Sequence, residues 1–146
     1  IIVGNEDNSS AYLTAFSDLV TMSGNQTIHF GFYNYTSGVG NWNNWVLGVN
    51  NGKERTDSSN EDYFLLRADA WENVSFTGDN ITSNYNWDTF IADMNGAYVD
   101  ITIKRTDNRI DVAAITTTTG GAVYTMNYFY EGSLADPLGA FLTIDG

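Results

Sequence analysis

Two tryptophans interleaved with carboxamides form the most chemically distinctive stretch of the chain, Asn41-Trp42-Asn43-Asn44-Trp45. Indole faces stack on the apolar CH patches of a sugar ring, and carboxamides both donate and accept hydrogen bonds. These residue types therefore favour a neutral ligand covered with hydroxyl groups. The alternative is that one or both tryptophans are core residues at the start of a strand, because large aromatic side chains are mostly buried.

Other aromatic and planar polar side chains extend this candidate set, and a concave sheet face could present several of them in a row. Such rigid side chains lose little entropy on binding, which favours a weakly hydrophobic ligand such as a sugar. We expect stacking from Trp42 and Trp71, and Tyr33 belongs to the same aromatic group. The predicted ligand-binding residues are Trp42, Asn43, Asn44, Arg67, Trp71, Tyr12, Tyr35 and His29.

Alternation along the following strand separates the two tryptophans. Trp45 shares one side with Leu47 and Val49, so it is better placed as a core anchor. Trp42 leaves a glycine turn beside two asparagines and is the better ligand candidate.

Catalytic groups are sparse. The one histidine, His29, sits in the middle of a strand, and the chain has no cysteine and no Gly-x-Ser-x-Gly elbow. A hydrogen-bonded or ligand-contacting role is therefore favoured for His29 over a general base. Carboxylates such as Glu54, Glu61 and Glu72 lie in polar stretches, where solvated charge explains them better than a glycosidase pair. We expect a domain that is not itself an enzyme.

A calcium site is a further expectation. Calcium takes several oxygen ligands from carboxylates, amides and carbonyls. Glu6 and Asp7 near the start and Asp145 near the end could meet if the terminal strands pair, and Glu6 and Asp145 are the predicted ligands. The alternative is that these carboxylates are simply solvated.

The charge balance excludes several classes of partner. The 146 residues carry 18 Asp and Glu against 6 Lys and Arg, a net charge of −12 without any basic cluster. Nucleic acid and anionic membranes are therefore excluded as partners. Polyanionic glycans are disfavoured unless a local basic patch or a cation mediates the contact. The composition, rich in Asn, Thr, Ser, Gly and Tyr, is typical of exported bacterial β-proteins.

The chain begins directly at Ile1-Ile2-Val3 and shows no signal-peptide or membrane-span pattern. We therefore expect a monomeric module cut from a longer, multidomain, extracellular or cell-surface protein.

Period-two alternation predicts strands over most of the chain. Residues 26–36 and 42–50 are expected to pair across the glycine turn, whereas 72–86 reads as a long connection. The clearest hairpin joins 97–105 to 109–117 through Asp107-Asn108, which would pair Lys104 with Asp111 and Ile103 with Val112. In the next strand, 123–130, loop length decides the facing, and the favoured parity buries Tyr124, Met126, Tyr128 and Tyr130.

The remaining elements complete the expected fold. Helical spacing of apolar residues appears only at 87–94, and 140–144 is the closing strand. Eight or nine strands without a βαβ pattern predict an all-β protein, an antiparallel β-sandwich (jelly roll) with one short α-helix. No linker or repeat is visible, so residues 1–146 are expected to form a single domain.

In this pattern the chain resembles the jelly-roll carbohydrate-binding modules of bacterial polysaccharide-degrading enzymes. The resemblance covers the whole chain and rests on the segments Gly4 to Asn8, Asn41 to Trp45, Tyr63 to Arg67 and Ala140 to Asp145. It implies a non-catalytic module that targets an appended glycoside hydrolase or lyase to a β-glucan or a related neutral plant or marine glycan. It also implies a structural calcium between the first and last strands. The alternatives are a small jelly-roll hydrolase or lyase and a structural adhesin-type surface domain.

Overall fold

The computed structural model describes residues 20–35, 44–50, 62–67, 81–83, 93 and 95–145, with side chains for 21–35, 49, 93 and 95–140. Within these residues, nine β-strands form two antiparallel sheets. No helix is among these described elements. The predicted helix at 87–94 lies outside the described residues except for Asp93.

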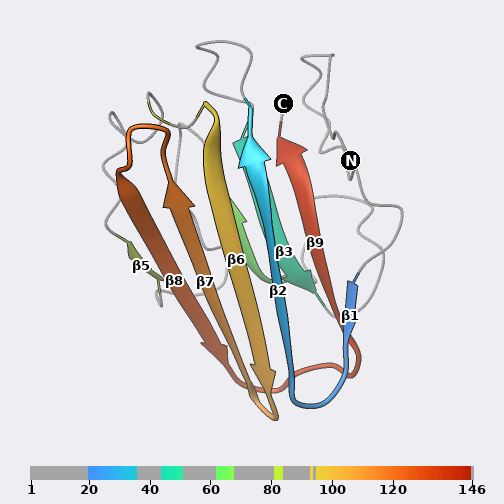
Figure 1. The fold of residues 1–146 in the computed structure, drawn as a ribbon. Coiled ribbons are helices and arrows are strands. Elements are labelled where there is room, and N and C mark those ends of the chain that lie inside the picture. Colours follow the sequence, from blue (N-terminus) through green and yellow to red (C-terminus); the bar gives the residue numbers. More distant parts are fainter. Residues whose placement is uncertain are drawn as a thin grey trace. The chain divides into compact units, whose positions relative to one another are not determined.

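The larger sheet has five strands in the order β2-β6-β7-β8-β5, and they lie side by side in Figure 1. Every neighbouring pair in it is antiparallel. The strands are β2 (Gln26–Asn34), β5 (Ile81–Ser83), β6 (Ala97–Thr106), β7 (Arg109–Thr117) and β8 (Val123–Glu131).

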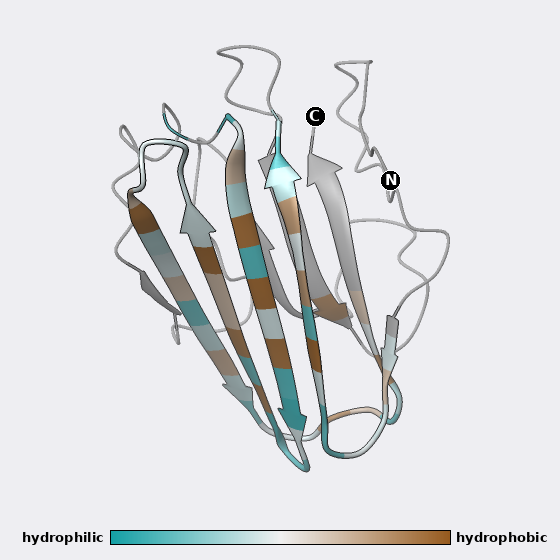
Figure 2. Ribbon diagram, viewed as in Figure 1, coloured by the Kyte–Doolittle hydropathy of each residue, from teal (hydrophilic) through white to brown (hydrophobic). Residues whose placement is uncertain are grey.

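One face of this sheet is buried because its strands alternate strictly. On β6, Val99, Ile101 and Ile103 are fully buried, and Figure 2 shows hydrophobic bands alternating with hydrophilic ones along this strand. On β7, Ile110 and Ala114 are buried on the same side. Each such aliphatic side chain contributes about 1.5–3 kcal/mol when it is removed from water. The other face carries mostly polar and aromatic side chains, together with the aliphatic Ala113, Ile115 and Val123.

The smaller sheet has four strands in the order β1-β9-β3-β4. They are β1 (Val20–Met22), β9 (Leu138–Asp145), β3 (Asn44–Asn50) and β4 (Asp62–Arg67). The register of β3 against β4 shifts between Val49 and Asn50. Val49, Met22 and Leu138 are fully buried.

Each sheet belongs to its own compact unit, and both units are discontinuous in sequence. The unit of the smaller sheet combines Ile1–Ser23, Asn41–Thr77 and Leu134–Gly146. The unit of the larger sheet combines Gly24–Gly40 and Gly78–Ser133. That the whole chain forms a single domain stays a prediction.

The predicted hairpin is confirmed residue by residue. Lys104 pairs with Asp111, Ile103 with Val112 and Ile101 with Ala114. The favoured facing of the next strand is also confirmed, because Thr117 pairs with Val123 across a five-residue loop. Met126 and Tyr128 are accordingly buried, whereas Val123 and Asn127 are exposed. Tyr124 and Tyr130, on the same side as Met126, are only half-buried.

Two sequence predictions are wrong. The strand after the glycine turn, β3, does not pair with β2: β3 lies between β9 and β4, and β2 pairs with β6. Consecutive strands are neighbours only about two-thirds of the time, and β6 matches β2 over nine residue pairs. The connection at 72–86 contains the strand β5, whose three residues are too short to show a period.

Candidate ligand-binding face of the five-stranded sheet

Three tyrosines gather on the exposed face of this sheet, at the end where β2 finishes and β6 begins. Their exposed fractions are 61% for Tyr33, 76% for Tyr35 and 37% for Tyr98. The ring centroids of Tyr33 and Tyr98 lie 5.1 Å apart, and those of Tyr33 and Tyr35 lie 6.1 Å apart. We call these three residues the tyrosine cluster. They form a continuous aromatic surface that remains open to a ligand.

A glycine gives the tyrosine cluster its arrangement. Tyr33 and Tyr98 are direct cross-strand partners, and Gly31 lies two residues before Tyr33 on β2. A Cβ atom at Gly31 would overlap the hydroxyl end of Tyr98. The Tyr98 ring therefore lies across β2 in the space that a side chain at position 31 would occupy.

The histidine lies one step further along the same face. His29 Nε2 is 2.7 Å from Asp100 Oδ1. The pair is diagonal, because His29 opposes Thr102 and Asp100 opposes Gly31. His29 is 61% exposed, so the imidazole is held by the carboxylate on one side and remains accessible on the other. His29 is thus hydrogen-bonded, as expected, and its contact with a ligand stays a prediction.

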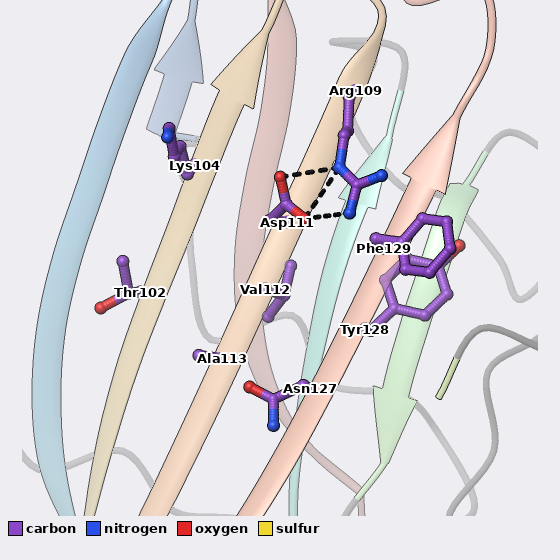
Figure 3. Close-up of a pocket in the computed structure, with 9 residues that line it drawn as sticks. All are labelled: Thr102, Lys104, Arg109, Asp111, Val112, Ala113, Asn127, Tyr128 and Phe129. Carbon is purple, nitrogen blue, oxygen red and sulfur yellow. Dashed lines mark hydrogen bonds and ion pairs between the residues drawn. The ribbon is translucent and has the colours of Figure 1, made fainter. Parts of the chain in front are cut away.

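Beyond His29 the same face contains a shallow hollow of about 380 Å³ (Figure 3). This volume falls at the lower end of the range for small-ligand sites, about 300–1,000 Å³. Small or polar side chains from one row of the sheet, Thr102, Ala113 and Asn127, lie along it. The next row adds Lys104, Asp111 and Phe129, and Arg109, Val112 and Tyr128 complete the lining.

Arg109 is locked in place at one side of the hollow. Its Nε donates to both carboxylate oxygens of Asp111 at 2.9 and 3.0 Å, and Nη2 donates to Asp111 Oδ1 at 2.7 Å. Nη1 donates to Glu131 at 3.3 Å. The guanidinium carbon of Arg109, on β7, lies 4.2 Å from the ring centroid of Phe129, on β8. Figure 3 shows these two side chains and the hydrogen bonds from Arg109 to Asp111. The hydrogen bonds to Asp111 raise the pKa of Arg109 above its ordinary value.

The predicted ligand residues fall in separate places. Tyr35 and His29 lie on the face just described. Asn44 begins β3 and Arg67 ends β4, where Arg67 opposes Val46. The backbones of Asn44 and Arg67 thus lie near the same end of the four-stranded sheet. The structure does not describe their side chains. Trp42, Asn43, Trp71 and Tyr12 lie outside the described residues altogether.

The predicted calcium ligands are described only in part. Asp145 is the Cα partner of Asn44 at the end of β9, whereas Glu6 lies outside the described residues. Within the side chains that the structure describes, no group of three or more His, Cys, Asp or Glu could hold a metal ion. No helix in the described part of the chain has the length and hydropathy needed to cross a membrane.

Sequence reasoning did not select most of this face. The sequence predicts Tyr98 and Asp100 only as members of the strand 97–105 and Lys104 only as the partner of Asp111. Asn127 and Phe129 belong to the strand 123–130, on the side opposite the predicted core set. The signal that could have found them is the alternation itself, because it places Tyr98 and Asp100 on the same side of β6. No family model, curated protein or solved structure matches this chain.

Proposed function

We propose that this protein is a carbohydrate-binding domain that attaches to a polysaccharide through the exposed face of its five-stranded sheet. The observation that carries the proposal is the tyrosine cluster beside the His29–Asp100 pair. Three large aromatic rings on a regular sheet face are held open to water, although such rings are usually mostly buried. Exposed aromatic surface of this kind marks a binding site.

The chemistry of the cluster suits sugar rings. Tyrosine offers an apolar face for CH groups and a hydroxyl that donates and accepts hydrogen bonds. A tyrosine side chain has few freely rotating bonds, so it loses little conformational entropy when a ligand binds. The imidazole of His29 and the carboxylate of Asp100 add polar groups within the same few strands. The net charge of −12 favours a glycan with a largely neutral backbone.

The wider identity follows the same proposal. The domain is a non-catalytic jelly-roll module of a secreted bacterial protein, monomeric within a longer chain, and its appended enzyme acts on a β-glucan or a related plant or marine glycan. Two antiparallel sheets, with strands drawn from interleaved segments, support the architecture. His29 lies on the same open face as the tyrosine cluster and is 61% exposed, so it is accessible to a ligand there. A structural calcium ion with Glu6 and Asp145 among its ligands stays part of the proposal.

The double variant Tyr33→Ala/Tyr35→Ala tests the binding face. We expect its retention by immobilised polysaccharide in affinity electrophoresis to weaken about tenfold or more, because two stacking surfaces are lost. A glycan array with the intact protein identifies the polysaccharide to immobilise. Both side chains are exposed, so thermal stability should change little.

Val123→Ala is the matched control. Val123 lies on the same face and in the same row as Tyr33, is 52% exposed and is not part of the tyrosine cluster. Its retention should equal that of the unmodified protein. If the tyrosine double variant is retained equally well, the face assigned here is wrong.

A further inference from the structure

The hollow differs electrostatically from the rest of this acidic protein. Three charged side chains line it, namely Lys104, Arg109 and Asp111. Asp111 uses both carboxylate oxygens to accept hydrogen bonds from Arg109. The charges of Arg109 and Asp111 therefore cancel within the lining, which leaves the positive charge of Lys104. Glu131, outside the lining, contacts Arg109 Nη1 and brings the wider group of four charged side chains to neutrality, in a chain whose net charge is −12.

Lys104 carries the remaining positive charge of the lining. It is exposed on β6 and stands directly opposite Asp111, the partner that the sequence suggests for it. Arg109 takes that carboxylate instead, and Lys104 makes no ion pair with any residue in the described part of the chain. An ammonium group next to Thr102 is thus available to a ligand.

We propose that the hollow is a second subsite, which binds a carboxylate-bearing sugar of the glycan through Lys104. This inference rests on the proposed function, because it assigns the class of sugar that extends from the tyrosine cluster. Lys104 pairs with the carboxylate, and Thr102 and Asn127 offer a hydroxyl and a carboxamide to the sugar's hydroxyl groups. Arg109, held by Asp111 and Phe129, forms a fixed wall and cancels the repulsion that Asp111 would exert.

The hollow lies next to His29, on the same face as the tyrosine cluster. Thr102, on its lining, is the cross-strand partner of His29. From there, the row His29, Thr102, Ala113 and Asn127 crosses four strands of the same face. At the usual strand spacing of about 4.8 Å, this row spans roughly 14 Å. A glycan could therefore contact the tyrosine cluster and the hollow together.

The net charge of the whole molecule further limits the class of polysaccharide that can bind. A dense polyanion is repelled by the net charge of −12, whereas one isolated carboxylate mainly feels the charges within a Debye length, about 8 Å at physiological salt. The matching ligand is a neutral-backbone polysaccharide with sparse uronate branches.

The test compares matched polysaccharides. A panel of neutral-backbone polysaccharides with isolated uronate branches, glucuronoxylan among them, is immobilised beside the carboxyl-reduced form of each. We expect the unmodified protein to bind the uronate form about two- to fivefold more tightly, the range for an exposed ion pair. The preference should disappear in the Lys104→Gln variant, survive in Lys104→Arg and weaken as NaCl is added.

Asn95→Asp controls for net charge. It makes the chain more negative by one unit, as Lys104→Gln does, at an exposed position outside the lining of the hollow and nine residues before Lys104, roughly 30 Å along an extended strand. It should keep the uronate preference. If the unmodified protein retains the uronate and carboxyl-reduced forms equally, and Tyr33→Ala/Tyr35→Ala still weakens that retention, the subsite is wrong and the proposed function stands. If the unmodified protein binds no polysaccharide of the panel or of the array, both proposals fail.

Discussion

Individual side chains on the exposed face owe their positions to small neighbours. Tyr98 can lie across β2 only because residue 31 has no side chain, and it thereby meets Tyr33 at 5.1 Å. Likewise, Asp111 does not serve Lys104 because Arg109, two residues away on the same strand, occupies it. The missing side chain at Gly31 therefore arranges the aromatic surface, and the pairing of Asp111 with Arg109 leaves Lys104 available to a ligand.

Gly31→Ala should disturb the tyrosine cluster without unfolding the protein. The new Cβ overlaps the hydroxyl end of Tyr98, and the far end of a side chain can move more easily than backbone. We expect a changed near-UV circular dichroism signal from tyrosine and weaker polysaccharide retention. Gly120→Ala is the matched control, since its Cβ would meet only Thr118 Oγ1 at 3.9 Å. An unchanged near-UV signal in Gly31→Ala would show that the ring is not held in this position.

Successive side chains of a strand point to opposite faces of the sheet, so each strand places core residues on one face and candidate ligand contacts on the other. On β6 and β7, alternate residues are buried, and most of the residues between them line the hollow or belong to the tyrosine cluster. A rigid pair of strands thus fixes the spacing of the exposed side chains, as a preformed binding face requires. The consequence is that two isoleucines of neighbouring strands, on opposite faces, should contribute very differently to stability.

Ile103→Ala and Ile115→Ala measure this difference. Ile103 is fully buried on β6, so its truncation should lower the free energy of unfolding by about 2–5 kcal/mol. Ile115 is 42% exposed on β7, and the same change there should cost less than about 1 kcal/mol. Both variants lose the same atoms from a strand, so each controls the other. Urea unfolding gives both values, and equal losses would contradict the assigned faces.

The whole molecule is strongly acidic, with a net charge of −12. Like charges repel in the compact state and destabilise it, and dissolved salt screens them. The same charge also limits the ligands that can approach, which is why a neutral backbone is expected for the glycan. Stability should therefore respond to ionic strength.

Adding NaCl should raise the melting temperature. The Debye length falls from about 30 Å at 0.01 M to about 8 Å at 0.15 M, so repulsion between distant carboxylates is largely removed. Differential scanning calorimetry at the two concentrations measures the shift. A neutral osmolyte at matched osmolality separates screening from excluded-solute effects. A melting temperature that falls or stays constant with NaCl would mean that favourable ion pairs outweigh the repulsion.

The sequence by itself determined the features that depend on near neighbours. The hairpin around Asp107-Asn108 was predictable to the residue pair, because a two-residue loop and the buried face of Ile103 and Val112 allow one register. The facing of β8 followed from the better core set, Met126 and Tyr128. The acidity and the absence of cysteine were equally plain from composition.

Only the tertiary structure decided which distant strands became neighbours. β2 pairs with β6 rather than with the next strand along the chain, and this choice brings His29 to Asp100 over 71 residues of sequence. The same pairing sets Tyr33 beside Tyr98 and His29 beside Thr102 of the hollow. Alternation specifies the face of each residue, but it carries no information about the partner strand. The candidate site depends on that partner, so it emerged only when the sheet was assembled.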